Sequence, residues 1–315
     1  LVRQPIGEEM GVRFIGWGAA VPDRVVTNDE LSQTLPTSDE WIVERTGIRE
    51  RRIGGTAKSL GVQAARRAMD AAGVDPDSID FLVMATTTPD RITPATAPMV
   101  AAELGLSCAA MDINAACSGF MYAVRTAYGL LETGARRVLV VGAENLSRWV
   151  DWNDRNMAVL LADGGGAAVL DYDPEVNELL AFELGASGQD ADLLTCEHGG
   201  FFEMDGKEVF RRAVRVVVDS AEKAMATAGI TSDDVALVVP HQANIRIIQA
   251  ACQRLNIPMD RAVVTLDRYG NTSSASIPLA YVDALENGRV KKGDYALLTG
   301  FGAGMTWASA ILRWS

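Results

Sequence analysis

Residues 68–74 read Ala-Met-Asp-Ala-Ala-Gly-Val, and residues 224–230 read Ala-Met-Ala-Thr-Ala-Gly-Ile, an offset of 156 positions (224 − 68). In both copies a short acidic linker leads into an apolar run, which begins at Ile79 in the first copy and at Val235 in the second. A helical pattern that ends at glycine and is followed by a buried strand is typical of α/β proteins. The repeated stretch therefore predicts an α/β fold built from two related halves.

A second pair of matching stretches supports this duplication. Leu131-Glu-Thr-Gly is matched by Leu285-Glu-Asn-Gly at an offset of 154 (285 − 131), and each is followed by an apolar run that ends in glycine. Chance likeness between two units of any α/β protein is the alternative, but ordered matches at a nearly constant offset favour duplication. We place the halves at residues 10–171 and 172–315, and we leave residues 1–9, which precede Met10, out of the fold.

Short apolar runs rich in β-branched residues alternate with longer amphipathic stretches along the chain. The runs predict buried strands and the amphipathic stretches predict helices. The predicted strands cover residues 81–85, 138–142, 235–239 and 295–300, and the predicted helices cover residues 58–72, 119–132, 209–228, 245–255 and 277–286. This alternation favours mostly parallel sheets that helices cover on both faces.

The bulk composition limits the classes of protein. A chain of 315 residues with 48% hydrophobic and 22% charged residues is typical of a soluble globular protein with two domains or one duplicated domain. The net charge of −12 argues against nucleic acid or an anionic membrane as the main partner. No apolar run approaches the ~18 residues of a membrane span, and no signal-peptide pattern opens the chain, so we expect a cytoplasmic protein. The four cysteines show neither CxxC nor metal-ligand spacing, which indicates a reducing compartment and no metal site.

Cys117 is the strongest candidate nucleophile. It lies in Asp112-Ile-Asn-Ala-Ala-Cys-Ser-Gly-Phe, directly before the predicted helix 119–132. The positive end of a helix dipole is expected to lower the pKa of its thiol, and the thiolate is the form that attacks acyl groups. A buried, unreactive cysteine is the alternative, and it suits the other three cysteines better; these are Cys108, Cys196 and Cys252.

His241 and Asn271 are the polar candidates of the second half. His241 follows the strand 235–239, at the strand end where ligands bind in parallel sheets, and it could donate to an enolate or thioester oxygen. A hydrogen-bonded loop histidine is the alternative, and His198, in the predicted loop Glu-His-Gly-Gly, is the weaker rival. The 154-residue offset places Asn271 opposite Cys117 (271 − 154 = 117), so a pseudo-twofold arrangement predicts one shared site. Helix capping would also explain an asparagine there.

Two glycine-rich stretches complete the candidates. Backbone N–H groups of Gly300-Phe-Gly-Ala-Gly-Met are expected to form half of an oxyanion hole. Asp163-Gly-Gly-Gly-Ala-Ala matches no phosphate-binding motif, so we assign no nucleotide site to it.

Five stretches in this order closely resemble the β-ketoacyl-acyl-carrier-protein synthase III family, from about Gly11 to Trp314. They are Thr37-Ser-Asp-Glu-Trp-Ile-Val-Glu-Arg-Thr-Gly-Ile-Arg, Ala116-Cys-Ser-Gly-Phe, Pro240-His-Gln-Ala-Asn, Gly270-Asn-Thr-Ser and Gly302-Ala-Gly-Met-Thr-Trp. The resemblance implies a thiolase-like five-layer αβαβα fold from two duplicated halves, usually in a homodimer. It also implies acyl transfer from acyl-CoA to Cys117 and then decarboxylative condensation with malonyl-acyl-carrier protein, which initiates fatty acid synthesis. His241 and Asn271 would promote decarboxylation and stabilise the enolate, with no cofactor beyond the thioester substrates.

The resemblance assigns further roles residue by residue. Backbone N–H groups of Cys117 and Ala303 would form the oxyanion hole; Ala303 replaces a glycine seen in many relatives. The CoA contacts would be Trp41, Arg45, Arg155, Gly206 and Asn244. The carrier-protein contacts would be Arg211, Arg215, Arg246 and Arg254, for which solvated helix faces are the alternative. Thr93 and Leu161 would line the acyl pocket. Thr93 stands where some relatives carry a bulky aromatic, which favours branched or longer primers.

Three other functions remain open at this point. A priming ketosynthase of a type II polyketide pathway would use the same residues. An acyltransferase that forms no carbon–carbon bond would not need His241 and Asn271, and a non-catalytic partner subunit would usually lack the nucleophile. The segment 187–204 looks shorter and more acidic than in relatives, so the sequence does not define the tunnel entrance.

Overall fold

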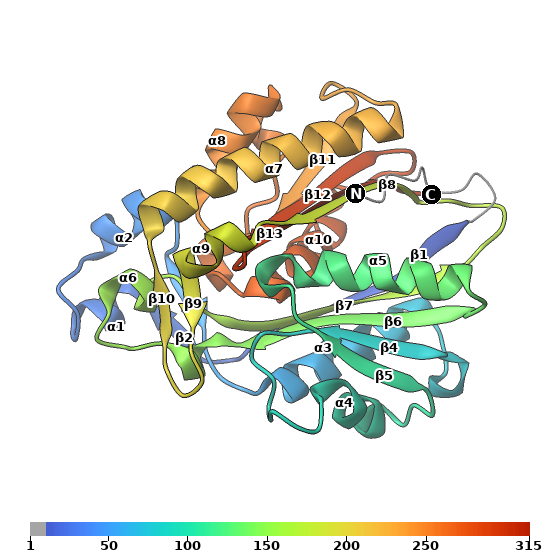
Figure 1. Cartoon of the computed structure of the whole chain (residues 1–315), viewed down its shortest axis with the longest axis horizontal. Helices are drawn as coiled ribbons and strands as arrows, with labels where there is room; N and C mark the ends of the chain where they lie inside the picture. Colours follow the sequence, from blue (N-terminus) through green and yellow to red (C-terminus); the bar gives the residue numbers. More distant parts are fainter. Residues whose placement is uncertain (1–10) are drawn as a thin grey trace.

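The computed structural model describes residues 11–315, so the predicted boundary at residue 10 and the nine residues before it lie outside the described part. Figure 1 shows five layers, in which two sheets alternate with three layers of helices. The five-stranded sheet has the order β1 (Val12–Ala20), β7 (Asp163–Tyr172), β6 (Arg137–Asn145), β4 (Phe81–Ala85) and β5 (Ala109–Ile113). The four-stranded sheet has the order β11 (Val235–Pro240), β12 (Tyr295–Gly302), β13 (Thr306–Arg313) and β8 (Leu179–Ala186).

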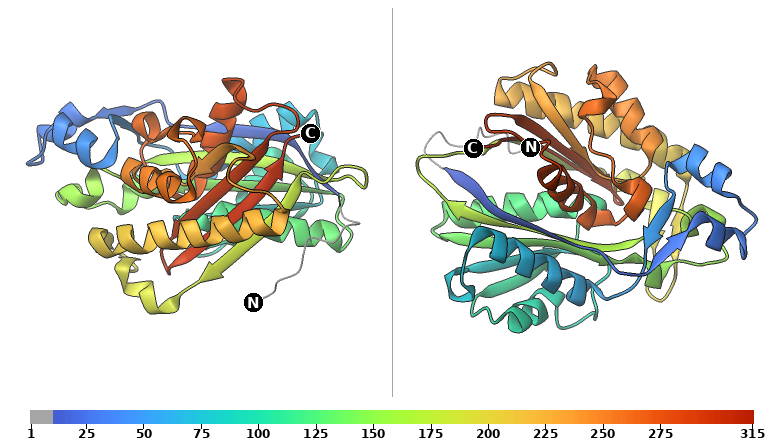
Figure 2. Two further views of the ribbon diagram at one scale, coloured as in Figure 1. Left: turned by 90° about the horizontal axis from the view of Figure 1, so that it is seen from above. Right: turned by 180° about the vertical axis from the view of Figure 1, so that it is seen from behind.

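The long helices cover both sheets. One outer layer, against the five-stranded sheet, holds α3 (Ala57–Ala72) and α4 (Thr96–Leu104). The central layer holds α5 (Gly119–Glu132) and α10 (Ser276–Glu286), and the other outer layer holds α7 (Gly206–Ala228) and α8 (Ile245–Leu255). Figure 2 shows α3 across the first sheet from behind and α7 across the second from above.

Shorter elements connect these layers. Two small hairpins are β2 (Val25–Thr27) with β3 (Glu50–Arg52), and β9 (Leu194–Cys196) with β10 (Phe202–Met204). The short helices are α1 (Asn28–Ser32), α2 (Asp39–Thr46), α6 (Arg155–Ala158) and α9 (Leu266–Tyr269). The 3₁₀ turns are η1 (Pro76–Ser78), η2 (Ala116–Ser118), η3 (Leu146–Trp149), η4 (Gly188–Leu193), η5 (Met259–Arg261) and η6 (Ser273–Ala275).

The two sheets repeat one topology. The order β1-β7-β6-β4 in the first is matched by β8-β13-β12-β11 in the second, where the fifth strand is reduced to a parallel bridge between Val238 and Ala262. The two copies of the opening motif end α3 and α7 at Gly73 and Gly229, whose φ values of 63° and 70° are the left-handed conformation that glycine allows. The predicted thiolase-like fold is confirmed. The predicted division at 171/172 falls at the end of β7 and stays a proposal.

The prediction of mostly parallel sheets is wrong. Across residues 11–315, three strand pairings within the two large sheets are parallel, β4 with β5, β4 with β6 and β11 with β12. The other four, β1 with β7, β6 with β7, β12 with β13 and β8 with β13, are antiparallel. The sequence pattern revealed only β4, β6, β11 and β12, all of which take part in parallel pairs, because the strands that run antiparallel to them lack long β-branched runs.

The glycines that open β7 have a packing role, which agrees with assigning no phosphate site to them. A Cβ atom on Gly165 would lie 2.7 Å from the carbonyl oxygen of Leu60 in α3. A Cβ atom on Gly166 would lie 2.6 Å from the ring of Pro278 in α10. These glycines therefore let helices approach the sheet closely on both faces. No helix within residues 11–315 is both long and apolar enough to cross a membrane.

Candidate active site

A cavity of about 850 Å³ brings together residues from both halves. Cys117, Leu161, Asn271 and Ala303 line it, as do Ser273 and Thr306. Its wall also includes the β9–β10 hairpin, so residues between 191 and 204 of the segment 187–204 line the cavity. His198 lies on this hairpin at the exposed side of the cavity.

Cys117 and Asn271 lie in two turns of the same design. In η2 the side-chain oxygen of Asn114 accepts a hydrogen bond from Ala116 N at 3.1 Å, and Ala116 has a φ of 49°. Near η6 the side-chain oxygen of Asn271 accepts from Ser273 N at 2.9 Å, and Ser273 also has a φ of 49°. We call these two turns the twin turns.

The twin turns correct the predicted pairing of Cys117 with Asn271. Because η2 begins at residue 116 and η6 at residue 273, their offset is 157 (273 − 116), so Cys117 corresponds to Ser274, and Asn271 corresponds to Asn114. The helices that follow have 14 and 11 residues. Because the second helix is three residues shorter, the offset between the two halves is 157 before these helices and 154 after them. Cys117 and Asn271 do share one cavity, as predicted, but they do not occupy equivalent positions of the two halves.

The predicted low pKa of Cys117 is wrong. Burial raises the pKa of this thiol to about 12, the nearby Glu144 carboxylate raises the pKa further, and a hydrogen bond with Ser273 lowers it. The turn at the start of α5 therefore does not offset the loss of hydration. Burial therefore favours the protonated thiol over the thiolate in the resting site.

His241 is held in one orientation at the end of β11. Its Nδ1 lies 2.6 Å from Ser276 Oγ, and Gln242 N donates to the same oxygen at 3.3 Å. Because Ser276 Oγ already accepts a hydrogen bond from Gln242 N, we assign the Ser276 hydroxyl as the donor to His241 Nδ1. Nδ1 is then the acceptor, and the ring proton lies on Nε2. Burial lowers the pKa of His241 to about 3, so the ring is a neutral hydrogen-bond donor.

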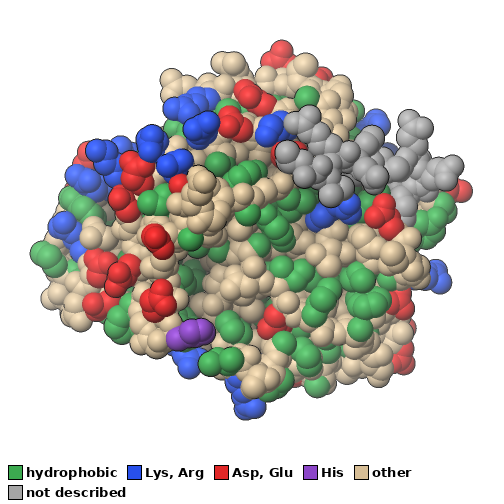
Figure 3. Space-filling view, viewed as in Figure 1, with side chains coloured by type: hydrophobic (Ala, Val, Ile, Leu, Met, Phe, Trp, Pro, Cys, Tyr) green, Lys and Arg blue, Asp and Glu red, His purple; other side chains and the backbone are tan. Residues whose placement is uncertain are grey.

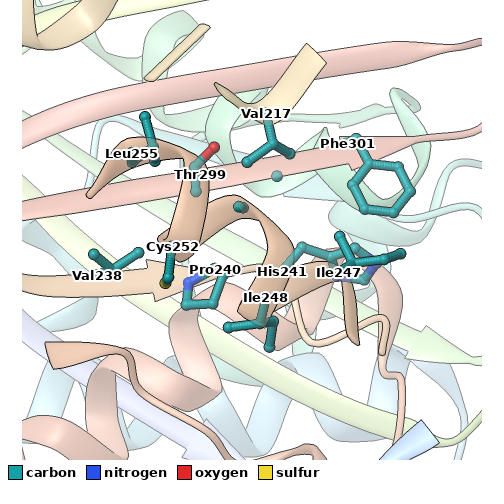
Figure 4. Close-up of a pocket in the computed structure, with 12 residues that line it drawn as sticks. Val217, Val238, Pro240, His241, Ile247, Ile248, Cys252, Leu255, Thr299 and Phe301 are labelled. Carbon is teal, nitrogen blue, oxygen red and sulfur yellow. The ribbon is translucent and has the colours of Figure 1, made fainter. Parts of the chain in front are cut away.

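The surroundings of His241 place it beside the nucleophile. A Cβ atom on Gly300 would lie 3.3 Å from the His241 Cβ and 3.8 Å from the backbone oxygen of Cys117, so Gly300 separates the two residues. Phe301 packs edge-on against the imidazole at 5.5 Å between ring centroids. Figure 4 shows a second cavity, of about 20 Å³, which His241 lines together with mainly apolar side chains such as Ile247 and Ile248.

Asn271 presents its amide N–H₂ as a donor. Its side-chain oxygen is engaged by Ser273 N, and its backbone pairs with the first half through Leu160 O at 2.9 Å and Ala162 N at 2.8 Å. For the Asn271 N–H₂ group we find no hydrogen-bond partner within residues 11–315, and the residue lines the cavity. The amide is therefore available to a substrate oxygen.

The glycine loop after β12 lies against the backbone of Cys117. A Cβ atom on Gly302 would lie 2.6 Å from Cys117 N. Thr306 Oγ1 donates to Ala115 O at 2.8 Å and accepts from Ser118 Oγ at 2.8 Å, which joins this loop to η2. The arrangement allows the N–H groups of Cys117 and Ala303 to act as one oxyanion hole, although their joint role stays a prediction.

The five residues expected to contact CoA lie outside the cavity wall, and four of them form a cluster: Trp41, Arg45, Arg155 and Asn244. The guanidinium groups of Arg45 and Arg155 lie 5.0 and 4.4 Å from the ring centroid of Trp41. Asn244 caps α8 by accepting from Arg246 N, and it donates to Arg45 O at 3.0 Å, which links α8 to α2. Gly206 is the first residue of α7. The cluster presents two cations and an aromatic face, groups that suit a nucleotide.

The four arginines predicted to contact a carrier protein are exposed, on α7 and α8. Arg211 pairs with Glu208 at 2.5 Å and Arg215 with Asp219 at 3.8 Å, so those two are partly neutralised on their own helix. Arg246 lies 5.8 Å from the Phe210 ring, and Arg254 is in the last turn of α8. Figure 3 shows Lys and Arg side chains gathered over the region of α2, α7 and α8, which differs from the acidic whole.

The two residues predicted to line the acyl pocket, Leu161 and Thr93, differ in their position relative to the cavity. Leu161 lines the cavity, whereas Thr93 is exposed and is absent from the wall that a single chain builds. Its neighbour Ile92 does line the cavity and is itself 90% exposed. Both Ile92 and Thr93 are exposed because residues 91–94 form a loop at the surface before α4.

Sequence reasoning missed three polar residues of the site, Glu144, Ser273 and Ser276. Glu144 is fully buried at the end of β6, and its only sequence signal is a carboxylate directly after an apolar strand. Ser273 and Ser276 belong to the small polar run after Asn271, which was read only as a helix start. Their contacts depend on tertiary packing of η6 against the first half, which a linear pattern does not reveal.

Fold and site together define a thiolase-fold condensing acyltransferase. A family model described as 3-oxoacyl-[acyl-carrier-protein] synthase III matches residues 111–188, and the model of its C-terminal part matches residues 225–314. The chain is 50% identical over 320 residues to the β-ketoacyl-[acyl-carrier-protein] synthase III of Roseiflexus castenholzii, covering 95% of this chain and 97% of the relative. The chain therefore belongs to the β-ketoacyl-[acyl-carrier-protein] synthase III family.

Solved structures give the same assignment. The 3-oxoacyl-[acyl-carrier-protein] synthase III of Aquifex aeolicus is 42% identical with a TM-score of 0.94, covering 96% of this chain and 100% of the other. The priming β-ketosynthase of the R1128 polyketide pathway is 39% identical with a TM-score of 0.92, covering 99% and 98%. Both fatty acid and polyketide enzymes thus share this fold and much of this sequence.

The low pKa of His241 predicts how decarboxylation responds to acid. An ordinary histidine becomes charged below a pKa of about 6.5. Since His241 stays neutral down to about 3, CO₂ release from a malonyl thioester should stay constant from about pH 8 to about pH 5. The measurement is the initial rate of CO₂ release across that range, with circular dichroism at each pH to verify folding. A decline with an apparent pKa near the ordinary histidine value would contradict the assigned state of His241.

Proposed function

We propose that this protein condenses an acyl-CoA primer with malonyl-acyl-carrier protein to give a 3-oxoacyl-acyl-carrier protein, CO₂ and free CoA. The observation that carries the proposal is the single cavity that Cys117, Asn271 and Ala303 line, with His241 separated from Cys117 by one glycine. Membership of the family supports the same reaction.

The residues divide the reaction into two steps. Cys117 attacks the primer thioester, the N–H groups of Cys117 and Ala303 stabilise the oxyanion, and CoA leaves. Malonyl-acyl-carrier protein then enters, and the Nε2–H of His241 and the amide of Asn271 donate to the thioester oxygen as CO₂ departs. The enolate carbon attacks the acyl carbon on Cys117, the bond between that carbon and the sulfur breaks, and the Cys117 thiolate that leaves takes up a proton from solvent. We propose that the thioesters are the only small molecules required, with no metal and no further cofactor.

A mass-spectrometric assay tests both steps. The protein is incubated with a panel of acyl-CoA primers, and the mass of the Cys117 peptide is measured before and after addition of malonyl-acyl-carrier protein. The proposal requires an acyl adduct on Cys117, followed by CO₂ release and loss of the adduct to product. An adduct that is transferred without CO₂ release would instead identify a simple acyltransferase.

A second candidate is the priming ketosynthase of a polyketide pathway. It is favoured by the 39% identity to such an enzyme and by the absence of a bulky aromatic at Thr93. Both roles allow short or branched primers, so the test that separates them compares condensation rates with malonyl-carrier proteins of a fatty acid system and of a polyketide system; faster reaction with the polyketide carrier protein would favour the second candidate.

We also propose a homodimer in the cytoplasm. Strand β5 is an edge of the five-stranded sheet, and Met111 on it is 37% exposed, so an apolar edge is free to pair with a second copy. All four cysteines are unpaired, which suits a reducing compartment. Light scattering of the purified protein, compared with Met111→Lys, tests the dimer; a monomeric parent would contradict it.

The arginine–tryptophan cluster predicts a selective change in CoA affinity. Trp41→Ala removes the ring that Arg45 and Arg155 contact, so KM for acyl-CoA should rise on the order of tenfold while kcat stays close to that of the parent. An acyl-N-acetylcysteamine thioester, which lacks the nucleotide, should react equally with both proteins. The matched control is Trp152→Ala, which removes an exposed tryptophan outside the cavity wall. Equal loss with both thioesters would contradict the nucleotide role.

A further inference from the structure

Arg51 is a fully buried arginine in the short strand β3. None of the ion pairs within residues 11–315 includes it. Its guanidinium instead donates to neutral oxygens of three segments. Nη1 donates to Val26 O at 3.0 Å, and Nη2 donates to Asn28 Oδ1 at 2.7 Å and to Val159 O at 3.1 Å. The planar fork of an arginine thus fixes the segment around residue 159 against β2 and the start of α1.

The contact with Val159 lies directly beside the backbone that holds Asn271. The next carbonyl, Leu160 O, accepts from Asn271 N at 2.9 Å, and Asn271 O accepts from Ala162 N at 2.8 Å. These two hydrogen bonds form an isolated parallel bridge between Leu161 and Asn271. Because the bridge does not continue into a strand, its position depends on neighbouring contacts such as that of Arg51.

The stem of Arg51 also packs against the residue that precedes Asn271. A Cβ atom on Gly270 would lie 3.0 Å from the Arg51 Cβ and 3.2 Å from Leu160 O. In addition, β3 contacts α9, the helix that ends directly before Gly270. Arg51 therefore touches both partners of the bridge: its guanidinium holds the segment from the first half, and its stem supports the segment from the second half.

We propose that Arg51 is a positioning residue for decarboxylation, which holds the amide of Asn271 in place through residues 159–162. This inference rests on the proposed function. Arg51 is absent from the cavity wall, so it does not touch the substrate and acts only through Asn271. The turn that carries Cys117 is joined to the glycine loop by the contact of Thr306 Oγ1 with Ala115 O, a contact in which Arg51 takes no part. Attack by Cys117 is therefore independent of Arg51.

The chemistry of a guanidinium suits this task better than that of an ammonium group. Burial lowers the pKa of Arg51 to about 10, so the side chain stays charged at neutral pH, and charged donors form stronger hydrogen bonds than neutral ones. The single nitrogen of a lysine cannot reproduce the fork that reaches three oxygens on three segments. Arg51→Lys consequently removes the three-way contact while it keeps a long side chain with a polar end.

Two rates measured with small thioesters test the proposal. Asn28 also donates to Asp39 Oδ1 at 2.8 Å, at the start of the helix that carries Trp41, so an Arg51 variant can disturb the arginine–tryptophan cluster. N-acetylcysteamine thioesters lack the nucleotide and avoid this complication. The first rate is acylation of Cys117 by the acetyl thioester, followed by rapid quenching and mass spectrometry, and the second is CO₂ release from the malonyl thioester.

Arg51→Lys should release CO₂ about 10–10²-fold more slowly than the parent, because a catalytic group misplaced by about 1 Å can cost 10²-fold. Acylation of Cys117 should stay at the parental rate. The matched control is Arg137→Lys, since Arg137 is a partly buried arginine that pairs with Asp171 at 2.9 Å outside the cavity wall. This control should keep both rates.

Two further variants show whether Arg51 acts through Asn271. Asn271→Ala alone should lower CO₂ release by about 10²–10³-fold, the cost of one donor. Adding Arg51→Lys to Asn271→Ala should cause no further loss, because the group that Arg51 positions is already absent. Gly270→Ala disturbs the same contact and leaves the guanidinium intact, so it should slow CO₂ release and spare acylation even if Arg51→Lys does not fold.

Three outcomes would overturn the role of Arg51. One is parental CO₂ release by a folded Arg51→Lys protein, with folding verified by circular dichroism. Another is a full additional loss when Arg51→Lys is combined with Asn271→Ala. The third is an equal loss of acylation and CO₂ release in both Arg51→Lys and Gly270→Ala, which would identify a general structural support. Absence of an adduct or of CO₂ release in the parent protein would instead overturn the proposed function itself.

Discussion

Cys117→Ala is expected to abolish the acyl adduct and to lower kcat/KM for condensation by on the order of 10⁶-fold, the scale seen when a hydrolase loses its nucleophile. The reason is that no second thiol of the described chain is placed against the N–H groups that the glycine loop brings to Cys117. CO₂ release from a malonyl thioester should persist, because His241 and Asn271 remain in place. The measurements are adduct mass, product formation and CO₂ release on one preparation.

Cys108→Ala is the control for this variant, since Cys108 is partly exposed and lies outside the cavity wall. It should acylate and condense like the parent. Retention of a stoichiometric adduct in Cys117→Ala would show that another group is the nucleophile. Simultaneous loss of CO₂ release would show that Cys117 supports the site rather than attacking the primer.

Gly302→Ala is expected to lower kcat by about 10²–10³-fold, the cost of losing one oxyanion donor. A Cβ atom at this position would lie 2.6 Å from Cys117 N and 2.8 Å from the Ala116 Cβ, so the loop must move away from η2. Cys117 N would then be displaced from its place in the proposed oxyanion hole, so one donor is lost, while the arginine–tryptophan cluster on α2 and α6 is unaffected. We expect KM for acyl-CoA to change little.

Gly129→Ala is the matched control, because Gly129 lies in α5, the helix that follows Cys117, with nothing within 4 Å of an added Cβ atom. This control should keep full activity and gain about 0.5–1 kcal/mol of stability, since alanine is a better helix former. Thermal unfolding separates a lost fold from a lost donor in Gly302→Ala. Parental kcat in a folded Gly302→Ala protein would exclude Cys117 N from oxyanion binding.

Sequence patterns located the helices and strands that have a regular apolar pattern, and they missed strands in which that pattern is interrupted. The predicted bounds of α5, α8 and β4 agree with the structure, because each has a clear apolar pattern; α5 begins at a glycine, α8 lies between two asparagines, and β4 is bounded by Asp80 and Thr86. Strands β1 and β7 were missed because glycines that serve helix packing interrupt their apolar pattern. The antiparallel half of each sheet was therefore invisible to periodicity.

The candidate site shows a similar limit. Residue types and family likeness pointed to Cys117, His241 and Asn271, whereas their ionisation states depend on burial, which a sequence does not state. Proximity to a helix start suggested a low thiol pKa, and desolvation gives the opposite direction. Glu144 has almost no local signal, since its eight hydrogen-bond contacts come from residues at least 56 positions away.

The twin turns hold different residues at the same position. In the first half the second residue of the turn is a cysteine open to substrate, and in the second half it is Ser274, which is sealed from the cavity and bound to Glu144. The two positions that the repeat makes equivalent therefore differ in access: of this pair only Cys117 faces the cavity, whereas Ser274 ties η6 to the first half through Glu144.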